Sequence, residues 1–597
     1  MMLKLAMLKR ASWLAALALS AGLVLPVAGV GAQTIPDWAS GRTRAEAAVL
    51  EGRIGQLTRR LGVSQRMLQE IVRILGADPR RFTFQRITEL LEQRAADAAQ
   101  LRAKLDELAA RLAAIEDAAL RDPATLALNR ARAALEQGRL AEAEQALAGL
   151  EVLRNATSAG ATQAWVQAVE ARADVAALQG RGGDAADIQL AAEAQLAAQT
   201  EATRWRLVMG AAAHLSREGD LTGDAASLER AVQILRRQAL PLAPRETRPQ
   251  DWASTQNSIG ANLQILADRD PGTARLREAA SAYQAALEFR VRGTADFLWA
   301  ETQYNLGHVL MILYEREGGD AKLVDAVAAY RASLEVRTRQ AHRLFWAASQ
   351  TALANAYYRL GLARNDRQLL ENARTAHLAS LSALTNDDSA EWVDATLNYA
   401  SFLGAMAARD QDRPAAREAV TRLETLTNSN LRTIAPVDWA VAMQSLGDAY
   451  AALSDIEGDP NGLLAAERAF RAALEVRRRD RMAQQWSRSQ YALADILLRI
   501  GRAETGTARL VEAVAAFDLA LEVITARHNF PDWASASSDR NLARVLIAQR
   551  SRDRALLGRV ERDIRALRAA FREAGHASGI QIQDNLLAYI ADVRRDM

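Results

Sequence analysis

The stretch DWAVAMQSLGDAYAALSDIEGDPNGLLAAERAFRAALEV, from Asp438 to Val476, contains the pattern that decides the fold. A polar turn around Asp459 and Pro460 divides it into two segments. The first segment contains Leu446, Gly447 and Tyr450, and the second contains Ala466, Phe470 and Ala473. Both segments thus combine small and large residues. Small residues let two helices approach closely, and large residues fill the space beside them. The stretch therefore predicts two antiparallel helices that pack against each other.

A tryptophan begins this unit and recurs on a fixed spacing along the chain. Eight tryptophans are separated by 47 residues, with one step of 46, at Trp205, Trp252, Trp299, Trp346, Trp392, Trp439, Trp486 and Trp533. A fixed period of roughly 20 to 50 residues indicates a repeat array. Because one helix pair cannot bury its apolar faces alone, neighbouring pairs are expected to stack.

The unit resembles the tetratricopeptide repeat (TPR) family. That pattern is a Leu-Gly pair, an aromatic residue three positions after the Gly, and then Ala, aromatic and Ala at steps of 4 and 3. The resemblance implies an all-α fold, an α-solenoid of stacked antiparallel helix pairs in a right-handed superhelix. The family period is about 34 residues, whereas the spacing here is 47. The extra residues fall in both helices, so each is expected to be longer by about one to two turns.

The tryptophans are predicted to be packing anchors at the helix starts. Trp299 and Leu306 lie on one helical stripe. Asp251, Asp438 and Asp532 directly precede a tryptophan and fit an N-cap, whose carboxylate accepts backbone N–H groups. A ligand-binding tryptophan in each repeat is the alternative.

Composition excludes several classes of function. The chain has 75 basic and 72 acidic residues, and the first 32 positions hold three of the basic residues and no acid. The remainder is neutral and indicates no nucleic-acid partner. With no cysteine, disulfides, thiolate metal sites and cysteine catalysis are excluded. The six histidines form no HExxH or HxxxH pair, and no phosphate loop or Gly-x-Ser-x-Gly elbow occurs. We therefore predict no catalytic residue, metal or cofactor.

Two features have a second interpretation. His377 fills an aromatic slot of the repeat, so it is predicted to be a substituted core residue rather than a functional one. Arg337, Arg339 and the run 477–479 are expected near helix C-termini, where cations suit the helix dipole. A phosphate site is the alternative for these arginines.

The N-terminus has the layout of a secretory signal peptide. The basic residues of positions 4–10 precede an apolar run from Trp13 to about Val30, and small residues lead to Ala32. We expect cleavage after Ala32 and export, with a periplasmic location. The alternative is an uncleaved anchor, although the apolar run is barely long enough to span a membrane and Pro26 interrupts it.

The sequence divides into five predicted regions. These are a signal peptide at 1–32, an N-terminal helical region at 33–120, short TPR-like helices at 121–204, the long-period array at 205–532 and a capping repeat at 533–597. The first of these helical regions holds a seam of apolar residues at steps of 4 and 3. It predicts either self-association as a coiled coil through residues 87–115 or a long helix that folds back on the first repeats.

The resemblance implies an exported, non-enzymatic scaffold whose concave face binds a peptide or protein partner. In the family, the groove is lined by first helices, at positions two before and two, five and six after the Leu of the Leu-Gly pair. The corresponding side chains are Tyr304, His308, Asn355, Tyr358, Arg359, Asp448, Tyr491 and Asp495. The Lys and Asn set that clamps a terminal carboxylate in some members is not reproduced, which puts such a ligand in doubt.

Three other readings remain. The groove residues can be ordinary solvated side chains. The protein can be a sensor or regulatory subunit of an envelope signalling system that oligomerises through the N-terminal helices. An enzyme is the third reading. Identifying the partner would separate the scaffold from the sensor, since no motif in the sequence does so.

Overall fold

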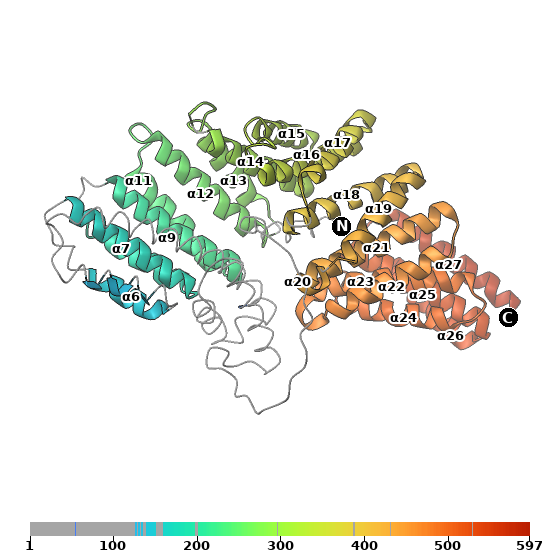
Figure 1. The fold of residues 1–597 in the computed structure, drawn as a ribbon. Coiled ribbons are helices and arrows are strands. Elements are labelled where there is room, and N and C mark those ends of the chain that lie inside the picture. Colours follow the sequence, from blue (N-terminus) through green and yellow to red (C-terminus); the bar gives the residue numbers. More distant parts are fainter. Residues whose placement is uncertain are drawn as a thin grey trace, which may run out of the picture. The chain divides into compact units, whose positions relative to one another are not determined.

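The computed structural model describes residues 139–150, 159–196 and 201–597, with gaps at 271, 295, 386–388, 430 and 528, and a few isolated positions before residue 139. Every regular element in this part of the chain is helical (Figure 1), which confirms the all-α prediction there. The predicted signal peptide and the seam within residues 87–115 lie outside the described residues. Among the described helices, none is long and apolar enough to span a membrane. No metal-binding group of acidic and histidine side chains occurs in the same part of the chain.

The chain forms two compact units, Met1–Glu391 and Trp392–Met597. The helices of the first unit are α6 (Leu140–Ala148), α7 (Ala159–Leu178), α8 (Gly182–Glu193), α9 (Glu201–Thr222), α10 (Ala225–Ile234) with a π-helical turn (Leu235–Ala239) and α11 (Leu240–Leu242), α12 (Pro249–Ala267), α13 (Ala274–Leu287), α14 (Asp296–Glu317), α15 (Asp320–Leu334), α16 (Arg343–Arg364) and α17 (Arg367–Ala383). Those of the second unit are α18 (Ser389–Asp410), α19 (Arg413–Thr427), α20 (Leu431–Ile434), α21 (Pro436–Glu457), α22 (Asn461–Val476), α23 (Arg479–Ala503), α24 (Ala508–Leu521), α25 (Phe530–Ser551), α26 (Arg554–Glu573) and α27 (Ala577–Asp596).

Within each unit the helices alternate between two roles. We call the helix that contains the periodic tryptophan the first helix of a repeat, and its partner the second helix. The first helices are α9, α12, α14 and α16 in one unit and α18, α21, α23 and α25 in the other. Each pair is joined by a short turn, and consecutive pairs lie side by side (Figure 1). A typical pair has 22 residues in α14 and 15 in α15.

Glycine and aromatic side chains meet inside the pairs as the sequence predicts. A Cβ atom at Gly447 of α21 would lie 2.5 Å from the ring of Phe470 in α22, so only glycine fits there. Farther along the same pair, Gly462 of α22 lies against Ser454 of α21. The second contact comes later on α21 and earlier on α22, so the two helices are antiparallel. Gly307 meets the ring of Tyr330 in the same way.

The helix starts differ from the sequence prediction. Six of the eight first helices begin three residues before the tryptophan, so α12 starts at Pro249 and α21 at Pro436, and α9 and α23 begin earlier still. Proline is favoured at the first helical position because it needs no N–H partner and its φ already fits a helix. Asp251 and Asp438 therefore lie in the first turn and not at the N-cap. In α25 the N-cap is Asn529, and Asp532 lies in the first turn.

Arginines connect the ends of consecutive first helices. Arg316 in the last turn of α14 donates hydrogen bonds to the carbonyl oxygens of Ala267 and Asp270, at 2.8 and 2.7 Å. Arg550 of α25 donates in the same manner to the carbonyl oxygens of Gly501 in the last turn of α23 and of Gly506 beyond it, at 2.7 and 2.6 Å. These carbonyl groups have no partner within their own helix, and a cation there also suits the helix dipole. Neighbouring repeats are thus joined at this end of the first helices.

Candidate partner-binding surface

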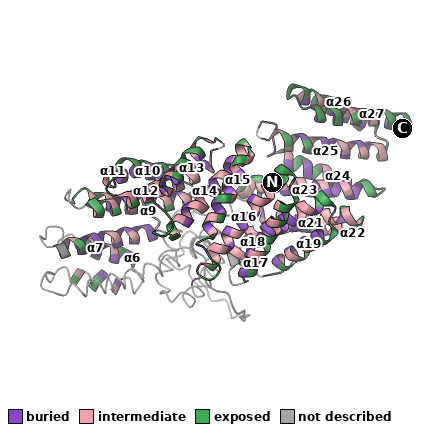
Figure 2. Ribbon diagram, turned by 90° about the horizontal axis from the view of Figure 1, so that it is seen from above, coloured by how far each residue is buried: buried purple, intermediate pink, exposed green. Residues whose placement is uncertain are grey.

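The first helices are enclosed far more than the second helices (Figure 2). From Trp299 to Tyr314 no residue of α14 is exposed, and from Gln485 to Gly501 no residue of α23 is exposed. The second helix α15, by contrast, has exposed residues along its length. Each first helix packs between neighbours, so its remaining side is lined by half-buried side chains. We call these half-buried side chains the first-helix face, and all eight predicted partner-binding residues lie on first helices.

In the first unit, Tyr304 and His308 lie on α14, one helical turn apart. The Tyr304 ring packs on Tyr330, with 5.6 Å between ring centroids, and the guanidinium of Arg337 lies 5.0 Å from its centroid. His308 Nδ1 lies 2.9 Å from Gln264 Nε2 on α12, the preceding first helix. The two predicted residues are therefore half-buried and held by neighbours.

Asn355, Tyr358 and Arg359 lie on α16 and are half-buried as well. As groove positions of the repeat, Asn355 and Arg359 are expected to be exposed, and the structure shows more enclosure. The Arg359 side chain is 18% exposed, and its Nη2 lies 3.7 Å from Glu315 Oε1 on α14. These side chains are enclosed because the neighbouring first helix, α14, covers one side of them.

A half-buried carboxylate accompanies these residues in the first unit. The Glu301 side chain is 18% exposed, and its Oε2 atom lies 3.7 Å from Arg290 Nη1. Burial raises the pKa of Glu301, while the charges of Arg290 and Arg337 act in the opposite direction. Two guanidinium groups thus compensate one carboxylate beside Tyr304.

In the second unit, Asp448 on α21 is exposed, and its Oδ1 lies 3.5 Å from Gln444 Nε2 one turn earlier. Tyr491 and Asp495 lie on α23. The Tyr491 hydroxyl donates to Asp539 Oδ2 on α25, at 3.4 Å. Burial raises the pKa of Tyr491, and the charges of Asp539 and Asp495 add to the effect.

Carboxylates repel one another on this part of the face. Burial, together with the charge of Asp495, raises the pKa of Asp539 to about 6, and only the Tyr491 hydroxyl opposes the shift. Burial also raises the pKa of Asp495, which Arg499 lowers and Asp455 raises. Arg499 is shared, because it forms ion pairs with both Asp455 and Asp495. Arg499 therefore compensates Asp495, while burial and a neighbouring carboxylate both raise the pKa of Asp539.

Several residues of the face are missing from the sequence prediction. Gln264, Glu315 and Asp539 contact His308, Arg359 and Tyr491, each from the adjacent first helix. The signal was present in the spacing: the partners stand 44 to 48 residues apart, close to one repeat. These pairs become visible in the sequence when the polar residues of all first helices are aligned on their tryptophans.

The tryptophans lie at the helix starts, in contact with arginines. Trp439 is 5% exposed, and its Nε1 donates to the carbonyl oxygen of Thr427 at 3.0 Å. The other seven periodic tryptophans are half-buried. Guanidinium groups lie over five of the rings, and one of them, Arg248, reaches Trp205 from the following repeat. The other four pairs, 4.6 to 5.9 Å from the centroid, are Arg245–Trp252, Arg339–Trp346, Arg432–Trp439 and Arg479–Trp486. In these four pairs the arginine stands seven residues before its tryptophan, so the contact recurs at one position of the repeat.

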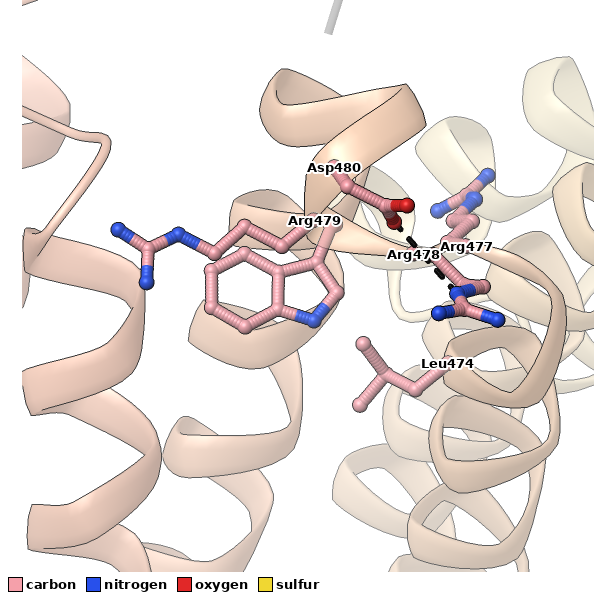
Figure 3. Close-up of a pocket in the computed structure, with 6 residues that line it drawn as sticks. Leu474, Arg477, Arg478, Arg479 and Asp480 are labelled. Carbon is pink, nitrogen blue, oxygen red and sulfur yellow. Dashed lines mark ion pairs between the residues drawn. The ribbon is translucent and has the colours of Figure 1, made fainter.

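One open pocket of about 620 Å³ lies at the loop between α22 and α23 (Figure 3). It is lined by Leu474, Arg477, Arg478, Arg479, Asp480 and Trp486. Arg479 extends over the Trp486 ring, and Arg478 Nε lies 3.5 Å from Asp480 Oδ1. None of the eight predicted partner-binding residues lines this pocket. It is a feature of the loop that enters the repeat, and not of the first-helix face.

No family model and no curated protein sequence matches the chain. Among solved structures, the apo form of RapI is 13% identical, with 64% of this chain and 97% of RapI covered, at a TM-score of 0.40. The apo form of the quorum sensor NprR from B. thuringiensis is 16% identical, with 63% and 98% covered, at 0.37. The TPR domain of P58(IPK) is 16% identical, with 72% and 99% covered, at 0.20. At these values the assignment of helical repeats rests on the chain's own packing.

Proposed function

We propose that the protein is a non-enzymatic scaffold that binds a segment of a partner protein on the first-helix face. One observation carries the proposal: within each unit, polar and aromatic side chains of neighbouring first helices contact one another on this face. His308 and Arg359 contact the preceding first helix, and Tyr491 contacts the next one. Tyrosine and arginine side chains are enriched at protein interfaces.

The proposal includes export to the periplasm, which follows from the signal-like N-terminus. A repeat protein that stacks half-buried polar groups along adjacent helices offers an extended site rather than a single pocket. Such a site suits a peptide or helix that spans several repeats.

A displayed library of random peptides, selected on the full chain, tests the binding proposal. Selected peptides are then titrated against the wild-type protein and the double variant Asn355→Ala/Arg359→Ala. The matched control is Glu371→Ala/Thr375→Ala, a pair with the same spacing on the exposed side of the second helix α17. We expect about tenfold or greater weakening for the first variant, which corresponds to about 1.4 kcal/mol, and none for the control. Failure to enrich any peptide, or equal effects of the two variants, would contradict the proposal.

A further inference from the structure

Three arginines occupy the same position of the repeat and are buried. Arg290, Arg337 and Arg477 stand nine residues before a tryptophan and are 4%, 1% and 0% exposed. Arginine is almost never fully buried without partners, because removing its charge from water is costly. Arg337 and Arg477 stand near the C-terminal ends of α15 and α22, as the sequence predicts, but their side chains are buried. Both side chains enter the contact between a second helix and the first helix of the next repeat, which we call the joint.

The joint between α22 and α23 shows the arrangement most clearly. Arg477 Nη1 donates to Ser489 Oγ at 2.6 Å and to Gln444 Oε1 at 3.1 Å. Ser489 Oγ donates in turn to Gln444 Oε1 at 2.7 Å. Gln444 lies on the preceding first helix, one turn before Asp448, and Ser489 lies in the first turns of the next one. Arg477, Ser489 and Gln444 therefore form a hydrogen-bonded network between two repeats.

The joint between α13 and α14 repeats this arrangement with other residue types. Arg290 Nη1 donates to Thr302 Oγ1 at 2.8 Å. Thr302 Oγ1 lies 2.9 Å from Asn257 Oδ1 on α12. A hydroxyl group again stands between the buried arginine and an amide of the preceding first helix.

At the joint between α15 and α16, an aromatic ring replaces the amide. Arg337 Nη1 lies 3.4 Å from Ser349 Oγ. Its guanidinium is 5.0 Å from the Tyr304 ring, and the rings of Phe297 and Phe345 lie at 5.6 and 5.1 Å. Aromatic faces attract a desolvated cation, which compensates for the missing acceptors.

The three joints follow one rule of position. The contacted side chain of the preceding first helix stands five residues after its tryptophan, and the hydroxyl three residues after the next tryptophan. In the joint between α24 and α25, Ile524 and Ala536 occupy the arginine and hydroxyl positions, and both are buried. Loss of the arginine is thus accompanied there by loss of its hydroxyl partner.

We infer that Arg290, Arg337 and Arg477 are positioning residues that connect a side chain of the preceding first helix to the start of the next repeat. Contact of a partner with Asn257 or Tyr304, or with Asp448 beside Gln444, is then transmitted to the joint. The part that concerns a partner rests on the proposed function. The connection itself can be measured on the protein alone.

Hydrogen–deuterium exchange of the full chain tests the connection, with Ser489→Ala and Ser487→Ala as a matched pair. Both serines are 0% exposed on α23, but the Ser487 hydroxyl bonds to the carbonyl of Gln484 in its own helix. We expect Ser489→Ala to speed exchange about tenfold in α21 around Gln444, because a hydrogen bond to a charged group is lost. Ser487→Ala should leave α21 unchanged. Equal effects of the two variants on α21, or none, would overturn the inference.

A second arm uses a peptide from the display selection whose binding is weakened by Asp448→Ala. Ser489→Ala should weaken this peptide although residue 489 is buried, whereas Ser487→Ala should not. If exchange in α21 becomes faster but peptide binding is unchanged, the joint is connected to α21, and the claim that partner binding depends on this connection is wrong. If no peptide is enriched at all, the proposed function fails, and the exchange comparison still decides on the connection.

Discussion

At the scale of single residues, close contacts and buried charges separate what a sequence pattern can and cannot predict. The glycine at position 447 is predictable, because a Leu-Gly pair and a later aromatic residue already specify which two helices meet. The burial of Arg477 is not predictable in this way. Its surroundings come from Gln444 and Ser489, which lie on two different helices. A polar side chain with partners on several elements needs the three-dimensional arrangement before its role can be read.

Alanine at two glycines tests the packing inside the repeats. A Cβ atom at Gly447 would lie 2.5 Å from the Phe470 ring, whereas nothing lies within 4 Å of one at Gly404 in α18. Gly447→Ala should destabilise by about 1–3 kcal/mol through overpacking. Gly404→Ala should stabilise by about 0.5–1 kcal/mol, because alanine suits a helix interior. Urea denaturation of both variants measures this, and a stabilising Gly447→Ala would contradict the assigned packing.

The charge of Asp539 makes stability depend on pH. Its folded-state pKa of about 6 lies above its ordinary value, so the folded state binds more protons between about pH 4 and pH 6. The contribution of protonated Asp539 to the free energy of unfolding is therefore present at low pH and is lost as the pH rises through about 6. Asp539→Asn should therefore raise the melting temperature at about pH 7.5, and the gain should shrink towards about pH 4.5. Melting curves across this range check it, and a gain that does not change with pH would speak against the shift.

At the scale of elements, the helices themselves were predictable and their first turns were not. Apolar spacing identified the helix pairs, but the tryptophan marked only an approximate start. Pro249 and Pro436 begin their helices three residues before the tryptophan. The degree of enclosure was also missed: Asn355 and Arg359 are half-buried because the adjacent first helix covers them. The sequence of one helix cannot show how closely its neighbours approach.

Two tryptophans at equivalent helix starts differ in enclosure, and their loss should differ accordingly. Trp439 is 5% exposed and its indole N–H is bonded, whereas Trp346 is half-buried. Trp439→Ala should cost about 3–5 kcal/mol, the range for a buried aromatic side chain. Trp346→Ala should cost clearly less. Denaturation midpoints of the two variants compare them, and a larger loss at Trp346 would show that exposure does not govern these anchors.

At the scale of the whole molecule, the periodic tryptophans predicted a helical array, and both units consist of such repeats in the described part of the chain. The division at residues 120, 204 and 532 stays a prediction. So does the location: the signal-like N-terminus predicts a mature protein that starts at Gln33. Intact mass of the protein recovered from the periplasm measures this, and retention of residues 4–10 would contradict cleavage.

The central claim is that a partner binds along the first-helix face. A hydrogen–deuterium exchange footprint of a selected peptide on the full chain tests it most directly, because it reports on every helix at once. The account predicts protection on first helices, in α14 and α16 or in α21 and α23, with little change on the second helices α15, α17 and α22. Protection confined to the second helices, or to residues before 139, would contradict it.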